Sequence, residues 1–240
     1  MDLKAVFFDV GITLVYPHPS FPELFAETLR SRGHRIDPAV VHEALAEFGS
    51  HFVDASKEGN LWSTSADLSR TFWLGLYRES VRAVGAPEEA VDDLAEALYR
   101  TFADPGKYRL HPDVLPTLEG LEKRGLKLAV ISNFEEWLEQ LLETLDVTRF
   151  FPVRVISGVE GVEKPDPKIF HLALERVGVE AAESAYVGDN PYFDVESARE
   201  VGMLPVLIDR QGRYPDVDCV RITSLEDLPQ ALGLETRSST

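Results

Sequence analysis

The stretch AYVGDNPYFDVESAREVGMLPVLI, residues 185–208, contains the pattern that decides the fold. Residues 185–187 form a short apolar run, which predicts a buried strand. Residues 194–201 carry apolar side chains at helical spacing and stop at Gly202, and residues 204–208 are apolar again. A strand, a helix and a second strand in this order predict parallel strands joined by a right-handed crossover.

The same alternation continues on both sides of this stretch. The further predicted strands are residues 3–8, 126–131, 153–156 and 220–222, and the further predicted helices are residues 114–124, 135–145, 166–178 and 224–232. Asp166 followed by Pro167 is a typical helix start, with a capping side chain and a proline in the first turn. We therefore expect an α/β fold with a doubly wound, Rossmann-like parallel sheet covered by helices on both faces.

An all-helical insert interrupts this core after its first strand. Four segments between residues 20 and 103 have helical periodicity, with Gly33, Gly59 and Gly85 between them: residues 21–29, 40–52, 68–84 and 88–102. The predicted domains are a core of residues 1–16 plus 108–235, a helical cap of residues 17–107, and a frayed tail of residues 236–240.

Composition excludes some classes of partner. The formal net charge of −17 argues against nucleic acid, which is held by clustered Lys and Arg. The apolar runs are too short to span a membrane, and the N-terminus lacks the pattern of a secretory signal. Cys219 is the only cysteine, which suits a reducing cytoplasm. Protein partners are not predicted.

Polar side chains follow the predicted strands, where a parallel sheet binds its ligands. Each of them alone also fits an ordinary turn or helix cap, but together, in this chain order, they indicate a site. These residues are Asp9, Ser132, Asn133, Lys164, Asp189 and Asp194.

Their chemistry suits phosphoryl transfer. Carboxylates at Asp9 and Asp189, with backbone carbonyls and water, form the sparse oxygen shell that Mg²⁺ prefers. Ser132 can bind a phosphoryl oxygen, and Lys164 supplies positive charge to both Asp9 and the transferring group. The expected intermediate is an aspartyl phosphate, which water then hydrolyses.

Four segments carry a family resemblance: FFDVGITLV (residues 7–15), ISNFEEWLEQLLETLDVTRFF (131–151), EGVEKPDPKIFHLALERVGV (160–179) and AYVGDNPYFDVESAREVGM (185–203). They resemble motifs I to IV of the haloacid dehalogenase (HAD) superfamily hydrolases, subfamily IA. The helical insert corresponds by position to the cap of that family.

The resemblance implies a role for each residue. Asp9 is the nucleophile, and Asp9, the carbonyl of Gly11 and Asp189 bind Mg²⁺. Asp194 completes the acidic metal site from behind these ligands. Phosphate or substrate is bound by Ser132, Asn133, Lys164 and Thr13, with Thr13 also supporting the loop.

Residue Gly11 departs from the usual motif Asp-x-Asp-x-Thr, whose second Asp is the general acid and base. The chain most resembles the group of rhythmically-expressed-gene-2-like and HAD-domain-containing-3 proteins, which lack this Asp. The expected function is a Mg²⁺-dependent phosphatase acting on a small phosphorylated metabolite, with weak activity on poor leaving groups. The alternatives are an impaired enzyme that binds a phosphorylated ligand or a protein, and a haloacid dehalogenase.

Five further residues are candidates for a role in the site. His18 is a candidate surrogate acid, although Pro17 and Pro19 favour a constrained loop. Lys57 is the only lysine between residues 20 and 103, and a solvated side chain is a better interpretation of it than a lysine that forms a Schiff base. Trp62, Phe72 and Trp73 are candidates for a substrate pocket, but aromatic residues at this spacing more often form a core.

Overall fold

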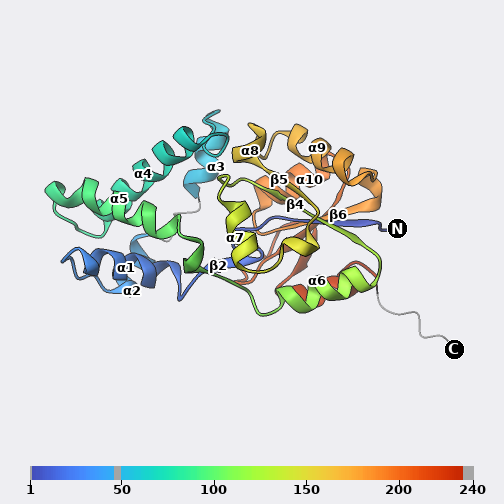
Figure 1. The fold of residues 1–240 in the computed structure, drawn as a ribbon, viewed down its shortest axis with the longest axis horizontal. Helices are drawn as coiled ribbons and strands as arrows, with labels where there is room; N and C mark the ends of the chain where they lie inside the picture. The colour runs from blue at the N-terminus through green and yellow to red at the C-terminus, as the bar shows by residue number, and fades with distance from the viewer. Residues whose placement is uncertain (1, 46–49, 235–240) are drawn as a thin grey trace.

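The computed structural model describes residues 2–45 and 50–234. A lobe of helices lies on one side of the molecule and a helix-flanked sheet on the other (Figure 1). The sheet has six parallel strands in the order β5-β4-β1-β6-β7-β8. These strands are β1 Ala5–Phe8, β4 Lys127–Ser132, β5 Val153–Ile156, β6 Ser184–Gly188, β7 Leu204–Ile208 and β8 Val220–Ile222.

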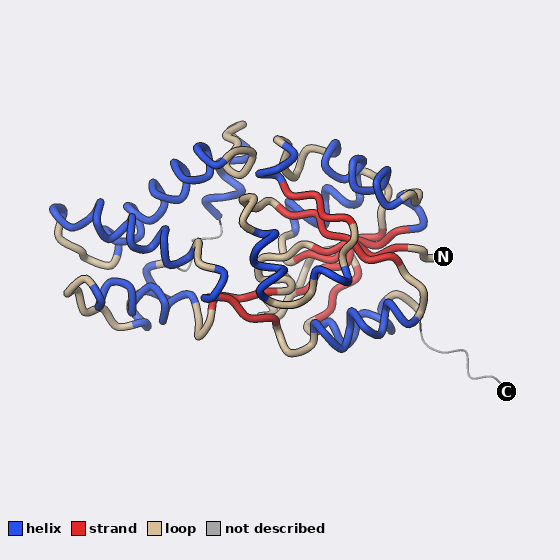
Figure 2. Tube along the Cα trace, in the orientation of Figure 1, coloured by secondary structure: helices blue, strands red, loops and turns tan. Residues whose placement is uncertain are grey.

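Helices cover both faces of the sheet, as Figure 2 shows. They are α6 Val114–Lys123, α7 Leu138–Thr144, α8 Ser157–Glu160, α9 Pro167–Val177, α10 Ser197–Glu200 and α11 Leu228–Ala231. Strand β1 alternates between two apolar clusters. Val6 and Phe8 pack with side chains of α6, α7 and α11, whereas Ala5 and Phe7 pack with those of α9 and α10. The predicted doubly wound α/β fold is confirmed.

The helical lobe lies between β1 and the rest of the sheet in the chain. Its helices are α1 Phe21–Ser31, α2 Pro38–Ala44, α3 Ser50–Lys57, α4 Ala66–Ala83 and α5 Val91–Phe102. Helices α1, α2, α4 and α5 share an apolar cluster of their own, which includes Phe25, Leu94 and Leu98. The exact domain boundaries, 1–16 plus 108–235 and 17–107, stay a prediction. The predicted helix over residues 40–52 includes residues 46–49, which lie outside the described residues, as does the predicted tail.

Two short strands were not predicted from the sequence. Strand β2, Val15–Pro17, pairs antiparallel with β3, Tyr108–Leu110, at the two points where the chain passes between the core and the helical lobe (Figure 1). Three residues are too few to show a strand period in the sequence. Within the described residues, no helix has both the length and the apolarity to span a membrane.

The predicted helix over residues 194–201 begins earlier and is irregular. A π-helical segment, η5 Pro191–Glu196, precedes α10. Asn190 begins it, because its side-chain oxygen accepts hydrogen bonds from the amides of Tyr192 at 2.9 Å and Phe193 at 3.1 Å. Segments of this kind are frequent at functional sites.

The strand order reverses around β1, because β4 lies on one side of it and β6, much later in the chain, on the other. In open α/β sheets such a reversal opens a crevice at the carboxyl ends of the strands. Asp9, Ser132 and Asp189 occupy these ends, so the topology brings them together.

Candidate active site

Asp9 stands at the centre of the strand-end residues. Its amide donates to the carbonyl of Val187 at 2.9 Å, which continues the pairing of β1 and leaves the side chain at the sheet edge. The carboxylate is buried and accepts hydrogen bonds from Ser132 Oγ at 3.0 Å and Lys164 Nζ at 2.9 Å. Burial, together with the charge of Asp194, raises the pKa of Asp9 despite the nearby ammonium group of Lys164.

Three hydrogen bonds hold the ammonium group of Lys164. Its Nζ donates to Asp9, to Asp194 at 2.7 Å and to Tyr186 Oη at 2.9 Å. Burial lowers the pKa of Lys164, but the charges of Asp194 and Asp9 outweigh burial and raise that pKa above its usual range. The lysine is therefore a permanent cation beside the carboxylate of Asp9.

Asn133 positions the backbone of Lys164. Its amide nitrogen donates to the carbonyl of Lys164 at 2.8 Å, and its amide oxygen accepts from the amide of Lys164 at 2.7 Å. The side chain also lines the cavity above the site. Substrate contact by Asn133 stays a prediction, and the contacts in the structure are those of a positioning residue.

Asp194 supports Lys164, and its predicted place behind the metal ligands stays a prediction. One of its oxygens accepts from Lys164 and from Tyr186 Oη at 3.1 Å, and the other accepts from the amide of Asn190 at 2.9 Å. Both oxygens are therefore engaged by protein donors. Gly188 makes this placement possible, since a Cβ there would lie 2.3 Å from Cγ of Asp194.

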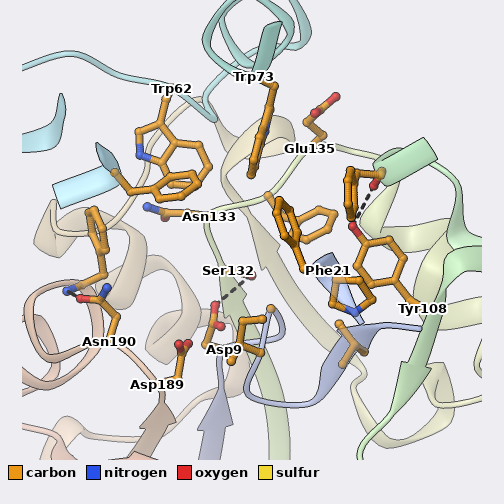
Figure 3. A pocket seen from close by; sticks show the side chains of 18 of the residues that line it. Asp9, Phe21, Trp62, Trp73, Tyr108, Ser132, Asn133, Glu135, Asp189 and Asn190 are labelled. Atoms are coloured by element: carbon orange, nitrogen blue, oxygen red, sulfur yellow. Dashed lines mark hydrogen bonds between the residues drawn. The ribbon is translucent and has the colours of Figure 1, made fainter. Parts of the chain in front are cut away.

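Asp189 lies beside Asp9 (Figure 3). Both Asp189 and Gly11 line the cavity. Asp189 accepts one long hydrogen bond, from Thr13 Oγ at 3.4 Å. Burial and the charges of Asp194 and Asp9 raise the pKa of Asp189 well above its usual range. The carbonyl of Gly11 accepts from the amide of Thr13 at 2.6 Å, and Ile12 between them has a φ of 60°, a strained value for a β-branched residue.

This donor set fits a small hard cation. Lys164 is shared by Asp9 and Asp194, so the carboxylate of Asp189 has no full counter-charge among the described residues. Two carboxylates and a backbone carbonyl at one edge are ligands that Mg²⁺ accepts while it keeps several water molecules. No group of three or more His, Cys, Asp or Glu side chains with metal-binding arrangement occurs in the described part of the chain. A cation here would depend on the Gly11 carbonyl and water.

Arg210 supports the loop after Asp9 through a hydrogen bond, and this residue was not predicted from the sequence. Arg210 donates to the carbonyl of Thr13 at 3.0 Å and forms two hydrogen bonds with the carboxylate of Asp113, at 2.7 and 3.0 Å. Asp113 also accepts from Ser224 Oγ at 3.0 Å and the amide of Leu225 at 2.9 Å. These residues are distant in the sequence, so no local pattern could have revealed the contact.

Replacement of Asp113 by Asn should destabilise the fold in a pH-dependent way. Burial raises the pKa of Asp113, but the hydrogen bonds from Arg210 and Leu225 outweigh burial and hold that pKa below its usual range. The ionised pair therefore stabilises the folded chain above the unfolded pKa of about 3.9, and this contribution is lost as the pH falls through the folded pKa. We expect a loss of about 1–3 kcal/mol in the free energy of unfolding at pH 7.

Urea denaturation at pH 7 and at pH 3.5 measures the effect. The exposed Asp216→Asn variant is the control and should match the parent at both pH values. An Asp113→Asn deficit that is as large at pH 3.5 as at pH 7 would show that the charge of Asp113 is not what stabilises the loop.

The helical lobe is fastened to the core beside Lys164. Glu163, 3 % exposed, accepts hydrogen bonds from the amides of Trp62 at 3.2 Å and Ser63 at 2.7 Å, and from Ser63 Oγ at 2.7 Å. Ser63 Oγ also lies 2.6 Å from Ser157 Oγ. This contact joins the residue before Lys164 to the segment between α3 and α4.

Replacement of Glu163 by Ala should weaken this contact, since it leaves two buried amides without an acceptor. We expect the free energy of unfolding to fall by about 2 kcal/mol or more. Chemical denaturation measures this, with the exposed Glu175→Ala variant of α9 as a control that should stay within about 0.5 kcal/mol of the parent. Equal stability of the two variants would contradict the predicted role of Glu163.

A cavity of about 410 Å³ opens above Asp9, between the core and the helical lobe (Figure 3). Trp62 and Trp73 line it, whereas Phe72 packs against them outside the lining. The two tryptophans therefore pack against other rings and also line the cavity, and substrate contact by them stays a prediction.

Three other titratable side chains, those of His18, Lys57 and Glu135, lie away from Asp9. His18 is exposed and is not among the lining residues, and its ring packs edge-on against Tyr16. Lys57 is exposed, with its ammonium group 5.4 Å from the ring centre of Tyr192. Glu135 lines the cavity, but Figure 3 places it near Trp73, across the cavity from Asp9. None of these three side chains is placed to replace the missing acid.

The site combines a buried carboxylate at a strand end, a buried lysine and a second acidic strand end, on a doubly wound sheet with a helical insert, and these features are typical of a HAD-type hydrolase. The model of the haloacid dehalogenase-like hydrolases matches residues 3–202, and the chain belongs to this family.

Individual proteins support the assignment. The chain is 31 % identical to haloacid dehalogenase-like hydrolase domain-containing protein 3 of Mus musculus, with 100 % of this chain and 97 % of the relative covered. It is 35 % identical to glyceraldehyde 3-phosphate phosphatase of Methanopyrus kandleri, over 90 % of this chain and 88 % of that one. The crystal structure of a HAD phosphatase from Thermococcus onnurineus aligns with a TM-score of 0.63 at 27 % identity, covering 96 % and 98 % of the two chains.

Proposed function

We propose that this hydrolase is a Mg²⁺-dependent phosphatase of a small phosphorylated metabolite, with Asp9 as its nucleophile. The observation that carries the proposal is the setting of Asp9. Its carboxylate is buried at a strand end, is oriented by Ser132 and Lys164, and lines an open cavity. The relative from Methanopyrus kandleri is a glyceraldehyde 3-phosphate phosphatase, which supports the proposal.

The reaction proceeds in two displacements. An oxygen of Asp9 attacks phosphorus, the bond from phosphorus to the leaving-group oxygen breaks, and an aspartyl phosphate remains. Water then attacks phosphorus, which releases inorganic phosphate and restores the carboxylate. Lys164 stabilises the negative charge on the transferring group, and its own position is held by Asp194 and Asn133.

Asp9, Asp189 and the carbonyl of Gly11 are the groups that would hold Mg²⁺. The bound cation would supply charge neutralisation for an anionic phosphate that must approach two carboxylates. The other side chains act without it: Ser132 orients Asp9, and Thr13 contacts Asp189.

Acetyl phosphate tests this proposal, since its carboxylate leaving group departs without a proton donor. We expect phosphate release that requires Mg²⁺ and falls at least about 100-fold when the ion is removed by chelation, because the carboxylates then repel the substrate. Restoring Mg²⁺ should restore the rate. Equal rates with and without chelator would contradict the metal requirement.

A second candidate function rests on Gly11. A glycine at the acid/base position leaves the second displacement without a base, which suits a protein that holds a phosphorylated ligand and releases it unchanged. Binding of phosphate with no turnover of acetyl phosphate would favour this candidate. A dehalogenase would instead release halide from a 2-haloacid with no added metal.

A further inference from the structure

The cavity above Asp9 has a largely aromatic lining on the side of the helical lobe. The helical lobe contributes Phe21, Phe52, Trp62, Trp73, Tyr77 and Phe102 to its lining. Tyr108, Phe134 and Trp137 continue the aromatic lining on the core side. At about 410 Å³ the cavity has room for a phosphate and a ring system.

The rings of four lining residues stack in sequence and form one wall of the cavity: Phe21, Phe102, Tyr77 and Trp73. Phe21 stacks on Phe102 with ring centres 4.6 Å apart, Phe102 on Tyr77 at 5.7 Å, and Tyr77 on Trp73 at 5.6 Å. Successive stacked rings fix one another in place, so the wall loses little side-chain entropy when a ligand binds. Flat aromatic surfaces of this kind favour a flat apolar ligand.

Some polar groups of the aromatic lining are already engaged, whereas the indole N–H groups of Trp62 and Trp137 have no hydrogen-bond partner in the described part of the chain. The hydroxyl of Tyr108 donates to the carbonyl of Phe102 at 2.8 Å, and that of Tyr99 donates to Glu135 at 3.0 Å. A sugar or polyol buried here would lose its hydrogen bonds to water and find few replacements, which is costly. The aromatic rings therefore disfavour a ligand with many hydroxyl groups.

The charges of the cavity disfavour a second anionic group on the leaving group. Asp9, Glu135, Asp189 and Asp194 line the cavity, and the lining cations are Lys164 and Arg213. Lys164 is committed to Asp9 and Asp194, and Arg213 is exposed. A neutral leaving group fits this balance best.

The absence of an acid at Gly11 points to the same class of substrate. An alkoxide is a strong base and needs a proton as it departs. A phenolate, whose conjugate acid has a pKa near 10, departs far more readily without one. An aromatic leaving group would thus pack against the aromatic wall and also depart without the acid that is absent at Gly11.

We infer, on the basis of the proposed phosphatase function, that the substrate is an aryl phosphate monoester whose uncharged ring lies against the wall of Trp73, Tyr77 and Phe102. The bond between phosphorus and the phenolic oxygen breaks as Asp9 bonds to phosphorus. Both electrons of the broken bond stay on the phenolic oxygen, which then takes a proton from water. A second water molecule releases inorganic phosphate from Asp9.

A substrate panel tests the inference. The parent enzyme with Mg²⁺ is assayed on 2-naphthyl phosphate, phenyl phosphate, cyclohexyl phosphate, glucose 6-phosphate and acetyl phosphate. We expect kcat/KM for 2-naphthyl phosphate to exceed that for glucose 6-phosphate by at least about 100-fold. Better binding of the flat ring and easier departure of the leaving group both contribute to this ratio. Cyclohexyl phosphate, similar in size to phenyl phosphate but neither flat nor able to leave as a phenolate, should have a higher KM and a lower kcat.

The outcomes separate the inference from the function on which it rests. Turnover of acetyl phosphate, with glucose 6-phosphate as good a substrate as the aryl phosphates, would overturn the inference and leave the phosphatase function intact. Failure of every substrate, acetyl phosphate included, would overturn the phosphatase function and the inference together.

Two neighbouring positions of α4 provide a matched pair of variants. Trp73 lines the cavity and Phe72 does not, and both are half-buried. Trp73→Leu should raise KM for 2-naphthyl phosphate by about five- to tenfold, the effect of a lost aromatic contact. Phe72→Leu should change that KM less than about twofold. An unchanged KM in Trp73→Leu would contradict the placement of the ring.

Discussion

Gly11→Asp is expected to convert the protein into an efficient phosphatase of alkyl phosphates. The new carboxyl group would protonate the departing alkoxide and then activate water, a contribution of about 10²–10⁴ in rate. The structure has room for it: a Cβ at Gly11 meets no atom within 4 Å, and Gly11 is not among the glycines with positive φ. Steady-state kinetics with cyclohexyl phosphate measure the gain.

Gly11→Asn is the matched control, because it has the same size and polarity as the aspartate variant but cannot exchange the proton. It should remain at the parent rate or below. The gain of Gly11→Asp should shrink for a substrate such as acetyl phosphate, whose leaving group needs no proton. If Gly11→Asp and Gly11→Asn behave alike on cyclohexyl phosphate, the acid at this position is not what limits the reaction.

Asp9→Asn is expected to abolish turnover, with a loss of about three orders of magnitude or more, since an amide cannot form the aspartyl phosphate. The fold should survive. Burial raises the pKa of Asp9, which means that its charge is costly in the folded chain, and a neutral amide removes that cost. We therefore expect a midpoint of thermal unfolding no lower than that of the parent.

Phosphate release and thermal unfolding, measured on the same preparation, check both parts. The exposed Asp216→Asn variant is carried through the same purification and should keep the parent's rate. Residual turnover of Asp9→Asn at more than about one per cent of the parent would mean that another group is the nucleophile or that a contaminating enzyme is present.

Much of the core could be predicted from the sequence. Strands β5, β7 and β8 have the bounds that their apolar runs predict, and α9 begins after Asp166, whose side chain accepts from the amide of Lys168 at 2.9 Å. These features depend on neighbouring residues. A buried strand needs a run of apolar side chains, and a helix start needs a capping residue, so both can be read locally.

The chain order of the polar strand ends was also informative. Because parallel strands present their carboxyl ends at one edge, the sequence indicated that Asp9, Ser132 and Asp189 would meet. What it could not indicate was how the oxygens and nitrogens are shared. Asn133 holds the backbone of Lys164 and Asp194 holds its side chain, and the predicted contacts of Asn133 with substrate and of Asp194 with the metal site stay predictions.

The contacts that connect distant parts of the chain were decided by the tertiary structure. Arg210 reaches the carbonyl of Thr13, and Glu163 reaches the amides of Trp62 and Ser63, across long separations in sequence. A hydrogen bond of this kind depends on the path of the whole backbone, and the residues on either side of each partner carry no sign of it.

The sequence by itself thus determined the type of fold, the order of the site residues and the missing acid at Gly11. Only the tertiary structure decided which aromatic side chains pack into a core and which face an open space. Helical periodicity places Phe72 and Trp73 on the apolar side of their predicted helix, and the same periodicity fits a packed interior and a cavity wall equally well. The difference arises because the helical lobe meets the core without filling the volume above Asp9.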